Sequence, residues 1–212
     1  MLPLLNEQTM TAASSPIPIG YTAIPRGHIA SVVTDLEMLS RPDLPGASLP
    51  QGFELAPVAE IGLDAYRALF RKVGADWLWF SRLFMEDGEL AAILAHPDVD
   101  IHIVRNGLGD VGILELDFRT EGECELAFLG LTADCTGRGV GRALMSKAVE
   151  LAWARPITRM WVHTCTYDHP SALRFYMKAG FTPYAIRVEV QRDPRLSGDL
   201  PKTAAAHVPI ID

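Results

Sequence analysis

Two neighbouring segments of the chain alternate apolar and polar residues as half-buried strands do. In residues 111–119, positions 114, 116 and 118 are apolar, whereas Glu115 and Asp117 point the other way. In residues 123–131, we expect one face to be formed by Cys124, Leu126 and Phe128 and the opposite face by Glu125, Ala127, Leu129 and Leu131. The polar, glycine-containing residues 120–122 between them predict a hairpin turn, so the two strands should pair antiparallel.

Other segments carry helical periodicity or short β-branched runs. Residues 140–154 repeat polar side chains every fourth position beside a broad apolar face, and Pro156 follows, which predicts a helix. We expect further helices over 64–73 (with Asp64 as N-cap), 83–94 and 171–179. We expect further strands within 27–38 and over 53–58, 100–105, 159–165 and 181–190. Strands that alternate with helices predict a mixed sheet flanked by helices, an α/β (α+β) fold.

Breaks in this pattern divide the chain into three parts. Residues 1–26 are rich in Pro, Ser and Thr and predict a loosely structured arm, and residues 41–46 predict a linker. We therefore expect an N-terminal extension over 1–50 with one extra strand, a main domain over 51–192, and an irregular tail over 193–212.

Composition narrows the class of protein. Apolar residues make up 49% of the chain and charged residues 21%, as in soluble globular proteins. A net charge of −7 without any basic stretch argues against nucleic-acid binding and is compatible with a cationic substrate. The chain shows neither a bilayer-length apolar run nor a charged, apolar leader, and its three cysteines form no pairing pattern. We expect a cytoplasmic protein with free thiols and no membrane partner.

The candidate chemistry begins at a glycine-spaced turn between a predicted strand and the helix over 140–154. Gly137, Gly139 and Gly141 let a ligand approach the backbone, and the first N–H groups of the following helix suit an anion. A P-loop needs Lys and then Ser or Thr after its last glycine, where this chain has Arg142 and Ala143. A dinucleotide loop needs a different glycine spacing and an acidic residue closing the next strand. Both alternatives fit poorly.

The turn resembles the acetyl-CoA-binding signature of the GNAT superfamily of N-acetyltransferases, through Arg138-Gly139-Val140-Gly141-Arg142-Ala143-Leu144 after the strand ending at Leu131. The segment His169–Phe181 resembles the family's second signature, Asn-x-x-Ala-x-x-x-Tyr-x-x-x-Gly-Phe. Two signatures in the family's order are more specific than either alone, and the resemblance covers residues 51–191. Thr136 departs from the Arg or Gln that is usual at its position, and His169 replaces the usual Asn.

The resemblance implies acetyl-CoA as donor, an amine as acceptor and no metal. It implies that the pyrophosphate is bound by Thr136, Gly137, Arg138, Gly139, Val140, Gly141 and Arg142. It implies that pantetheine lies along Leu129, Gly130 and Leu131, with Gly130 as the residue that disturbs strand pairing, and against His169 and Ala172. Tyr176 matches the tyrosine assigned as general acid to the CoA sulfur, and Glu125 matches the glutamate that takes a proton from the amine.

Several of these residues also have simpler interpretations. Tyr176 is equally the type of residue that anchors a helix to a sheet, and Glu125 the type that forms a salt bridge on a strand. His163, Cys165 and His169 are metal-capable, although no Cys-x-x-Cys pair accompanies them. The aromatic segment 77–84 is typical of a cage for a cation or of an ordinary core between helices.

These observations favour an N-acetyltransferase that acts on a primary amine of a small molecule by direct attack. A peptide or protein amine remains an alternative acceptor. Two further alternatives are a noncatalytic, regulatory CoA-binding domain and a scaffold that uses residues 1–50 for oligomer contacts. The expected assembly partner is a second copy of the chain.

Overall fold

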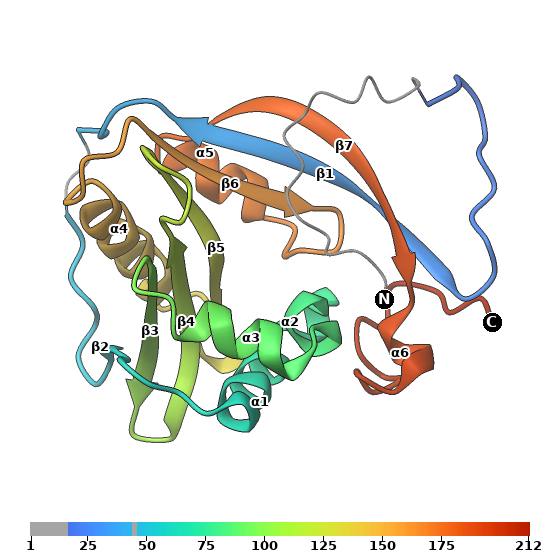
Figure 1. Ribbon diagram of the computed structural model, residues 1–212, viewed down its shortest axis with the longest axis horizontal. Helices are drawn as coiled ribbons and strands as arrows, with labels where there is room; N and C mark the ends of the chain where they lie inside the picture. Colours follow the sequence, from blue (N-terminus) through green and yellow to red (C-terminus); the bar gives the residue numbers. More distant parts are fainter. Residues whose placement is uncertain (1–16, 44–45) are drawn as a thin grey trace.

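The computed structural model describes residues 17–43 and 46–212 (Figure 1). A single seven-stranded sheet has the order β2-β3-β4-β5-β6-β1-β7. Only β5 and β6 pair in parallel, and every other neighbouring pair is antiparallel. The strands are β1 (His28–Met38), β2 (Glu54–Pro57), β3 (Val99–Asn106), β4 (Gly109–Asp117), β5 (Glu123–Leu131), β6 (Arg159–Cys165) and β7 (Thr182–Arg192). This mixed sheet, with helices on both faces, confirms the predicted fold class.

Two groups of helices cover opposite faces of the sheet. One apolar core packs the sheet against α4 (Val140–Ala152) and α5 (Ala172–Lys178). The other packs it against α1 (Leu63–Gly74), α2 (Ser81–Phe84), α3 (Asp87–Leu94) and the chain after α6 (Pro194–Ser197). Two short 3₁₀ helices, Ala75–Trp77 and Ala133–Cys135, complete the elements. Within the described residues, no helix has the length and apolar character needed to cross a bilayer.

The N-terminal strand β1 lies inside the sheet, between β6 and β7. It pairs with β6 from Val33 opposite Cys165 to Met38 opposite Met160, and with β7 along nearly its whole length. In Figure 1 the β1–β7 ribbon arches away from β3, β4 and β5. The strand predicted within 27–38 is confirmed, and it belongs to the same sheet as the strands of the predicted main domain. Of the predicted arm and linker, residues 1–16 and 44–45 lie outside the described part of the chain.

The structure corrects two predicted helix boundaries. α1 begins at Leu63 with Gly62 as its N-cap, and Asp64 lies in the first turn, where its charge faces the helix N-terminus favourably. The single helix predicted over 83–94 is two helices, because Met85 is extended between them (ψ 137°). Arg67 stabilises this break by donating to the Met85 carbonyl at 2.6 Å and to the Asp87 carboxylate.

The C-terminal tail is more ordered than its proline-rich sequence predicts. Asp193 and Arg195 are both buried, and the guanidinium donates to the Asp193 carboxylate at 2.7 and 2.9 Å. Arg195 also donates to the carbonyls of Ala204, Ala205 and Val208. One buried guanidinium therefore ties the tail to the sheet, and this arrangement is invisible in the composition of the segment.

Candidate functional site

The sheet opens between its two parallel strands. β5 and β6 pair at only three positions, from Glu123 opposite Arg159 to Glu125 opposite Trp161, and then diverge. From Leu126 onward, the edge of β5 that faces β6 therefore has no strand partner among the described residues. Backbone N–H and C=O groups on such an edge hydrogen-bond readily to an extended ligand. A small cleft of about 140 Å³ lies in the opening.

A β-bulge at Ala127 sets the direction of the β5 side chains. Glu115 of β4 lies opposite Phe128, and the next residue, Leu116, lies opposite Leu126, so Ala127 is the extra residue. The simple alternation predicted for this strand is therefore wrong beyond Leu126. Phe128 packs in the α1–α3 core, whereas Leu129 and Leu131 pack in the α4–α5 core with Leu126.

The irregularity lies at Ala127 and not at Gly130, where the sequence placed it. Gly130 pairs regularly with Ile113, and a Cβ at this glycine would come within 2.6 Å of Val73 and 2.7 Å of Trp79. Gly130 is therefore required by close packing of α1 and Trp79 against the strand, a structural reason independent of any ligand.

The glycine turn has the backbone conformation that its sequence suggests. Gly137 and Gly139 adopt φ values of +72° and +83°, in the left-handed region that favours glycine. Gly139 is the N-cap of α4, and residues 136–139 are all exposed. The first N–H groups of this 13-residue helix therefore point from an exposed turn, as an anion site requires.

The three side chains of the turn that were predicted to bind the anion differ in their contacts. The Thr136 hydroxyl donates to the Ala133 carbonyl at 2.7 Å, so its proton is already used within the turn. The Arg138 guanidinium lies 5.3 Å from the centre of the Phe53 ring. Arg142 lines a groove of about 610 Å³ between α4, α5 and the segment around residues 41–47, together with Lys178. The positive charges near the turn are thus contributed by Arg138, Arg142 and Lys178.

Tyr176 of α5 lies at the floor of the cleft between β5 and β6. It is buried, and it lines the cleft with Leu126, Val162 and Asp168. Burial first, and then the negative charge of Asp168, raise the pKa of the Tyr176 phenol well above its usual value. The phenol therefore remains protonated throughout the physiological range and is available as a hydrogen-bond donor.

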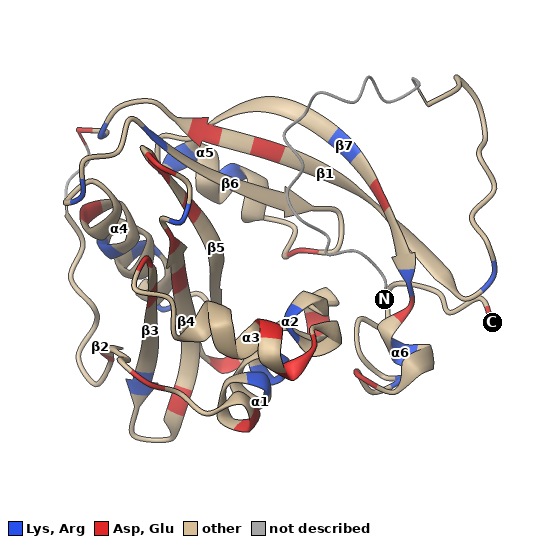
Figure 2. Ribbon diagram, viewed as in Figure 1, with Lys and Arg blue, Asp and Glu red and all other residues tan. Residues whose placement is uncertain are grey.

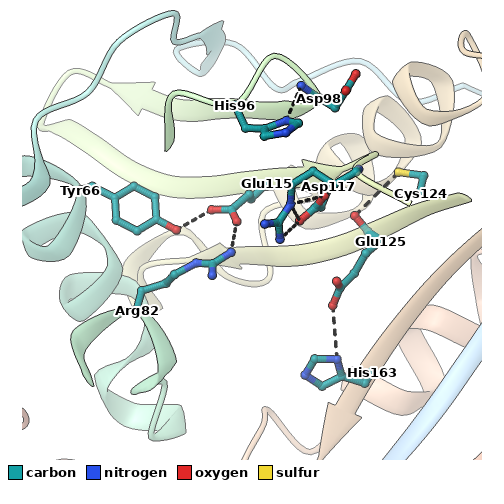
Figure 3. Close-up of polar contacts among 10 residues, drawn as sticks. Tyr66, Arg82, His96, Asp98, Glu115, Asp117, Cys124, Glu125 and His163 are labelled. Atoms are coloured by element: carbon teal, nitrogen blue, oxygen red, sulfur yellow. Dashed lines mark hydrogen bonds and ion pairs between the residues drawn. The ribbon is translucent and has the colours of Figure 1, made fainter. Parts of the chain in front are cut away.

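Glu125 and His163 face one another across the last paired position of β5 and β6. The His163 Nδ1 atom lies 3.7 Å from a Glu125 carboxylate oxygen (Figure 3). The Glu125 side chain is 17% exposed and the His163 side chain is 47% exposed, so both reach the solvent-filled space beside the strands. A carboxylate and an imidazole, two side-chain types that serve as general bases, are thus placed together beside the opening; of these two, the sequence analysis named Glu125.

A larger cleft of about 880 Å³ adjoins the first one, and Glu125 lines it. The two clefts share Ser81, Ala127, Phe128, His163 and Glu189 in their walls. They therefore meet at the β5 bulge, with Tyr176 on one side of the meeting point and Glu125 on the other.

Carboxylates outnumber cations around the larger cleft. Figure 2 shows acidic positions on the elements that border it, and the acidic lining residues are Glu89, Asp117, Glu125 and Glu189. Its two guanidiniums already have carboxylate partners: Arg119 pairs with Asp117 at 2.6 Å, and Arg82 pairs with the buried Glu115. The net field in the cleft is consequently negative and favours a cationic ligand.

A buried polar cluster lies behind this cleft (Figure 3). Glu115, which is fully buried on β4, accepts hydrogen bonds from the Tyr66 hydroxyl and the Arg82 guanidinium. Burial lowers the pKa of Arg82, but the charge of Glu115 outweighs this effect, so the net pKa is raised and the guanidinium stays charged. Arg82 also lies 5.1 Å from the centre of the Phe128 ring, so the cluster supports the residue next to the bulge.

The remaining candidates occupy the start of α5. His169 is exposed, its Nδ1 atom lies 2.7 Å from the Ser171 hydroxyl, and its ring contacts Trp77 edge-on. Ala172, the first residue of α5, is half-buried against the α4–α5 core. His169 and Ala172 therefore lie near the opening, but unlike Tyr176 of the same signature they are not among the residues that line the cleft.

The structure also bears on two alternatives from the sequence, a metal site and an aromatic cage in segment 77–84. Among the described residues, no group of three or more His, Cys, Asp or Glu side chains is arranged to hold a metal ion. Trp79 packs against Phe70 and Phe128 in the core, and Phe80 packs against Phe84. Of the four aromatic residues of segment 77–84, Trp79 packs against the core, Phe84 is exposed, and Trp77, Trp79 and Phe80 line the smaller cleft.

Sequence reasoning missed Asp168 as a member of the site. One of its carboxylate oxygens accepts from the Thr164 hydroxyl at 2.7 Å and the Cys165 backbone N–H at 2.9 Å, and the other accepts from Trp79 at 3.3 Å. Asp168 thereby fixes the end of β6 to the start of the second signature. Its position directly before His169 was the available signal, because an acidic residue after a strand often closes a turn on the backbone.

Comparison with known proteins establishes the family. The model of the acetyltransferase (GNAT) family matches residues 65–181, which is more than half of the chain. The chain therefore belongs to the GNAT family of acetyltransferases. No curated protein matches the sequence.

Solved structures resemble the fold at low sequence identity. A GCN5-related N-acetyltransferase from Sphaerobacter thermophilus superposes with a TM-score of 0.54 at 15% identity, over 78% of this chain and 53% of that one. A GCN5-related N-acetyltransferase from Kribbella flavida gives a TM-score of 0.51 at 21% identity, over 81% and 63%. An aminoglycoside acetyltransferase from an uncultured soil sample gives 0.50 at 16% identity, over 61% and 88%. The chain thus spans little more than half of the Sphaerobacter protein, and these likenesses concern the fold alone.

Proposed function

We propose that this protein transfers the acetyl group of acetyl-CoA to a primary amine of a small, cationic acceptor by direct attack. The observation that carries the proposal is the meeting of the two clefts at the β5 bulge. A buried phenol, Tyr176, lies on one side of this point, and the Glu125–His163 pair lies on the other. Acetyl transfer needs a donor site and an acceptor site that meet at the reacting carbonyl.

The donor fits the smaller cleft and the turn beside it. The N–H groups at the start of α4, with Thr136, Gly137, Arg138, Gly139, Val140, Gly141 and Arg142 around them, provide the pyrophosphate site. The unpaired edge of β5 at Leu129, Gly130 and Leu131 offers strand-like hydrogen bonds to the amide groups of pantetheine. His169 and Ala172 border this path from α5. The thioester then lies near Tyr176.

An ammonium group loses one proton to solvent before it can attack, because only the neutral amine has a free electron pair. The amine nitrogen then forms a bond to the acetyl carbon, the carbon–sulfur bond breaks, and the nitrogen loses a second proton to Glu125 directly, through water, or to His163. The negative charge that develops on sulfur must also be stabilised. Tyr176 donates a hydrogen bond to the departing thiolate. Because its pKa is raised above that of a thiol, complete transfer of the phenolic proton is unfavourable, and the hydrogen bond itself provides the stabilisation.

The acceptor class follows from charge. The excess of carboxylates around the larger cleft attracts a protonated amine. A second ammonium group on the acceptor would be attracted electrostatically to Glu89 or Glu189 while the reacting amine is deprotonated at Glu125. Trp161, which also lines the cleft, adds an aromatic surface that suits a cation. A diamine or polyamine-like molecule satisfies this arrangement better than a neutral or anionic amine.

The experiment is an assay of released CoA thiol across a panel of mono-amines, diamines and amino acids, with mass spectrometry of the products. We expect acetylated diamines to dominate. Tyr176→Phe and Glu125→Gln should each lower kcat by about 10²–10⁴-fold and leave the affinity for acetyl-CoA within about twofold. Tyr21→Phe, at a fully exposed tyrosine, is the matched control. Unchanged turnover in both site variants would remove the assigned roles.

Binding of the donor is tested separately by calorimetry. Gly139→Ala strains a backbone at φ +83° that a side chain rarely adopts, and Gly139→Glu adds repulsion of the pyrophosphate. Both should weaken acetyl-CoA binding, the second more strongly. A protein that binds acetyl-CoA but acetylates no amine would favour the noncatalytic alternative, and acetylation of peptides alone would favour a protein acceptor.

A further inference from the structure

The last strand of the sheet leaves one edge and one face open. β7 is the outermost strand of the sheet, and within the part of the chain that the structure describes its only strand neighbour is β1. Nine of its eleven residues are exposed, although the strand is rich in Val and Ile. A long edge strand offers a row of unpaired N–H and C=O groups to another chain, and proteins normally cover or block such edges.

Apolar side chains form a stripe on one face of the β1–β7 ribbon. Ile186, Val188 and Val190 alternate along β7 and are 73%, 47% and 48% exposed, and Val32, opposite Val188 on β1, is 43% exposed. The alternate residues Arg187, Glu189 and Gln191 point to the other face, where Glu189 and Gln191 line the smaller cleft. Clustered apolar exposure of this kind marks an interaction surface.

The order of residues along β7 makes the strand complementary to itself. We propose that β7 pairs antiparallel with β7 of a second copy, across a two-fold axis at Val188. In this register Val188 faces its own counterpart, and Ile186 faces Val190, so the two apolar stripes join. Arg187 then lies opposite Glu189 of the second copy, which gives two symmetric pairs of opposite charge.

The charges favour a second copy over an unrelated strand. Arg187 already contacts the buried carboxylate of Asp35, but its side chain remains 51% exposed and can reach a further acceptor. Shifting the axis by one residue, to Arg187, would place two guanidiniums opposite each other, which is unfavourable. Only the register centred on Val188 satisfies both the apolar and the charged positions.

This pairing also affects the clefts, because Glu189 contributes to the walls of both. In the paired state, the partner's β7 would lie directly beside the β7 that borders them. The interface and the acceptor side of the site would share one strand. The pairing rests on β7 alone and does not depend on the proposed acetyl transfer.

Light scattering of the full chain tests the pairing. We expect twice the mass of a single chain for wild type at micromolar concentration. Ile186→Lys combined with Val188→Lys should give the mass of one chain, and Glu189→Arg should raise the dimer dissociation constant at least tenfold. Leu108→Lys, at an exposed apolar residue in the β3–β4 turn, should change nothing. A wild type with the mass of one chain, or stripe variants that remain dimeric, would overturn the proposal.

Cross-linking tests the register. Val188→Cys should form an intermolecular disulfide under mild oxidation, because the two positions face each other at the axis. Val190→Cys alone should not, whereas a mixture of Ile186→Cys and Val190→Cys chains should. Wild type, whose three cysteines are buried or half-buried, serves as the control for the native thiols. Equal cross-linking of the Val188 and Val190 single variants would contradict the two-fold register. Circular dichroism of each variant establishes that it is folded.

Discussion

The two halves of the sheet, on either side of the opening between β5 and β6, treat charge in opposite ways. In the half formed by β2 to β5, Glu115 is fully buried and receives its hydrogen bonds from Tyr66 and Arg82 inside the protein. In the half formed by β6, β1 and β7, polar residues such as His163 and Glu189 face the clefts, and β7 is exposed along most of its length. The first half is built as a rigid support, and the second leaves groups accessible.

A similar contrast exists within the first half, between two glutamates on adjacent strands, one in the core and one at the border of the opening (Figure 3). Glu115 on β4 has two fixed donors and no exposure, so its charge serves the fold. Glu125 on β5 lies beside His163 with part of its carboxylate exposed to the cleft. The same residue type, one strand apart, is structural where it is fully buried with its donors in the core, and is available for chemistry where part of its side chain is exposed to a cleft.

The largest expected effect separates these two glutamates. Glu115→Ala leaves the Arg82 guanidinium buried without its carboxylate, so we expect a loss of about 3–5 kcal/mol in the free energy of unfolding. Glu125→Ala should cost less than about 1 kcal/mol in stability, although it should abolish most turnover. Urea denaturation of both variants measures the contrast. Similar stability losses in the two variants would remove the distinction between the structural glutamate and the glutamate that faces the cleft.

A smaller effect is expected from the buried carboxylate of the other half. Asp35 is nearly fully buried on β1, but its partner Arg187 is half exposed. Asp35→Ala leaves a guanidinium that water can solvate, so we expect a loss of about 1–2 kcal/mol, clearly below that of Glu115→Ala. The same denaturation assay applies, with Arg187→Ala as the reciprocal variant. That reciprocal change strands a buried carboxylate and should therefore be the more costly of the two.

The smallest effect is a dependence of stability on alkaline pH. Burial first, and then the charge of Glu115, raise the pKa of Tyr66 well above its usual value of 10.0. The contribution of the neutral Tyr66 to the free energy of unfolding is fully present below pH 10. It is lost progressively as the pH rises above 10, because Tyr66 ionises in the unfolded chain but not in the folded chain. The stability gap between wild type and Tyr66→Phe should therefore narrow by about 0.8 kcal/mol between pH 8 and pH 10.5. A constant or widening gap would mean that Tyr66 is not held neutral beside Glu115.

Local patterns predicted much of the fold. The alternation in 111–119 and 123–131 and the short turn between them predicted the β4–β5 hairpin, although β4 is buried on both faces from Val111 to Asp117 and not half-buried as the alternation implied. The glycines at 137, 139 and 141 predicted a turn before a helix, and the structure has this turn, with φ values of +72° and +83° at Gly137 and Gly139. The roles assigned to Tyr176 and Glu125 remain predictions, but both side chains are placed at the opening of the sheet.

Other features could not be predicted because they depend on distant partners. The bulge at Ala127 leaves no trace in the pattern, since apolar residues follow it on both faces of the strand. The ion pair between Arg82 and Glu115 joins residues 33 positions apart, and an isolated glutamate on a strand is usually exposed. The position of β1 between β6 and β7 depends on the topology of the whole sheet, which short-range periodicity does not specify.

The insertion of β1 between β6 and β7 has a consequence for synthesis on the ribosome. The strand emerges early, yet its contacts are remote; the Val32 backbone N–H bonds to a Thr166 hydroxyl 134 residues further along the chain. The β3–β4 and β4–β5 hairpins can form from local contacts while translation continues, whereas β1 has no partner strand until β6 and β7 have been made. Cotranslational folding thus begins in the middle of this sequence, and its two ends close the sheet together.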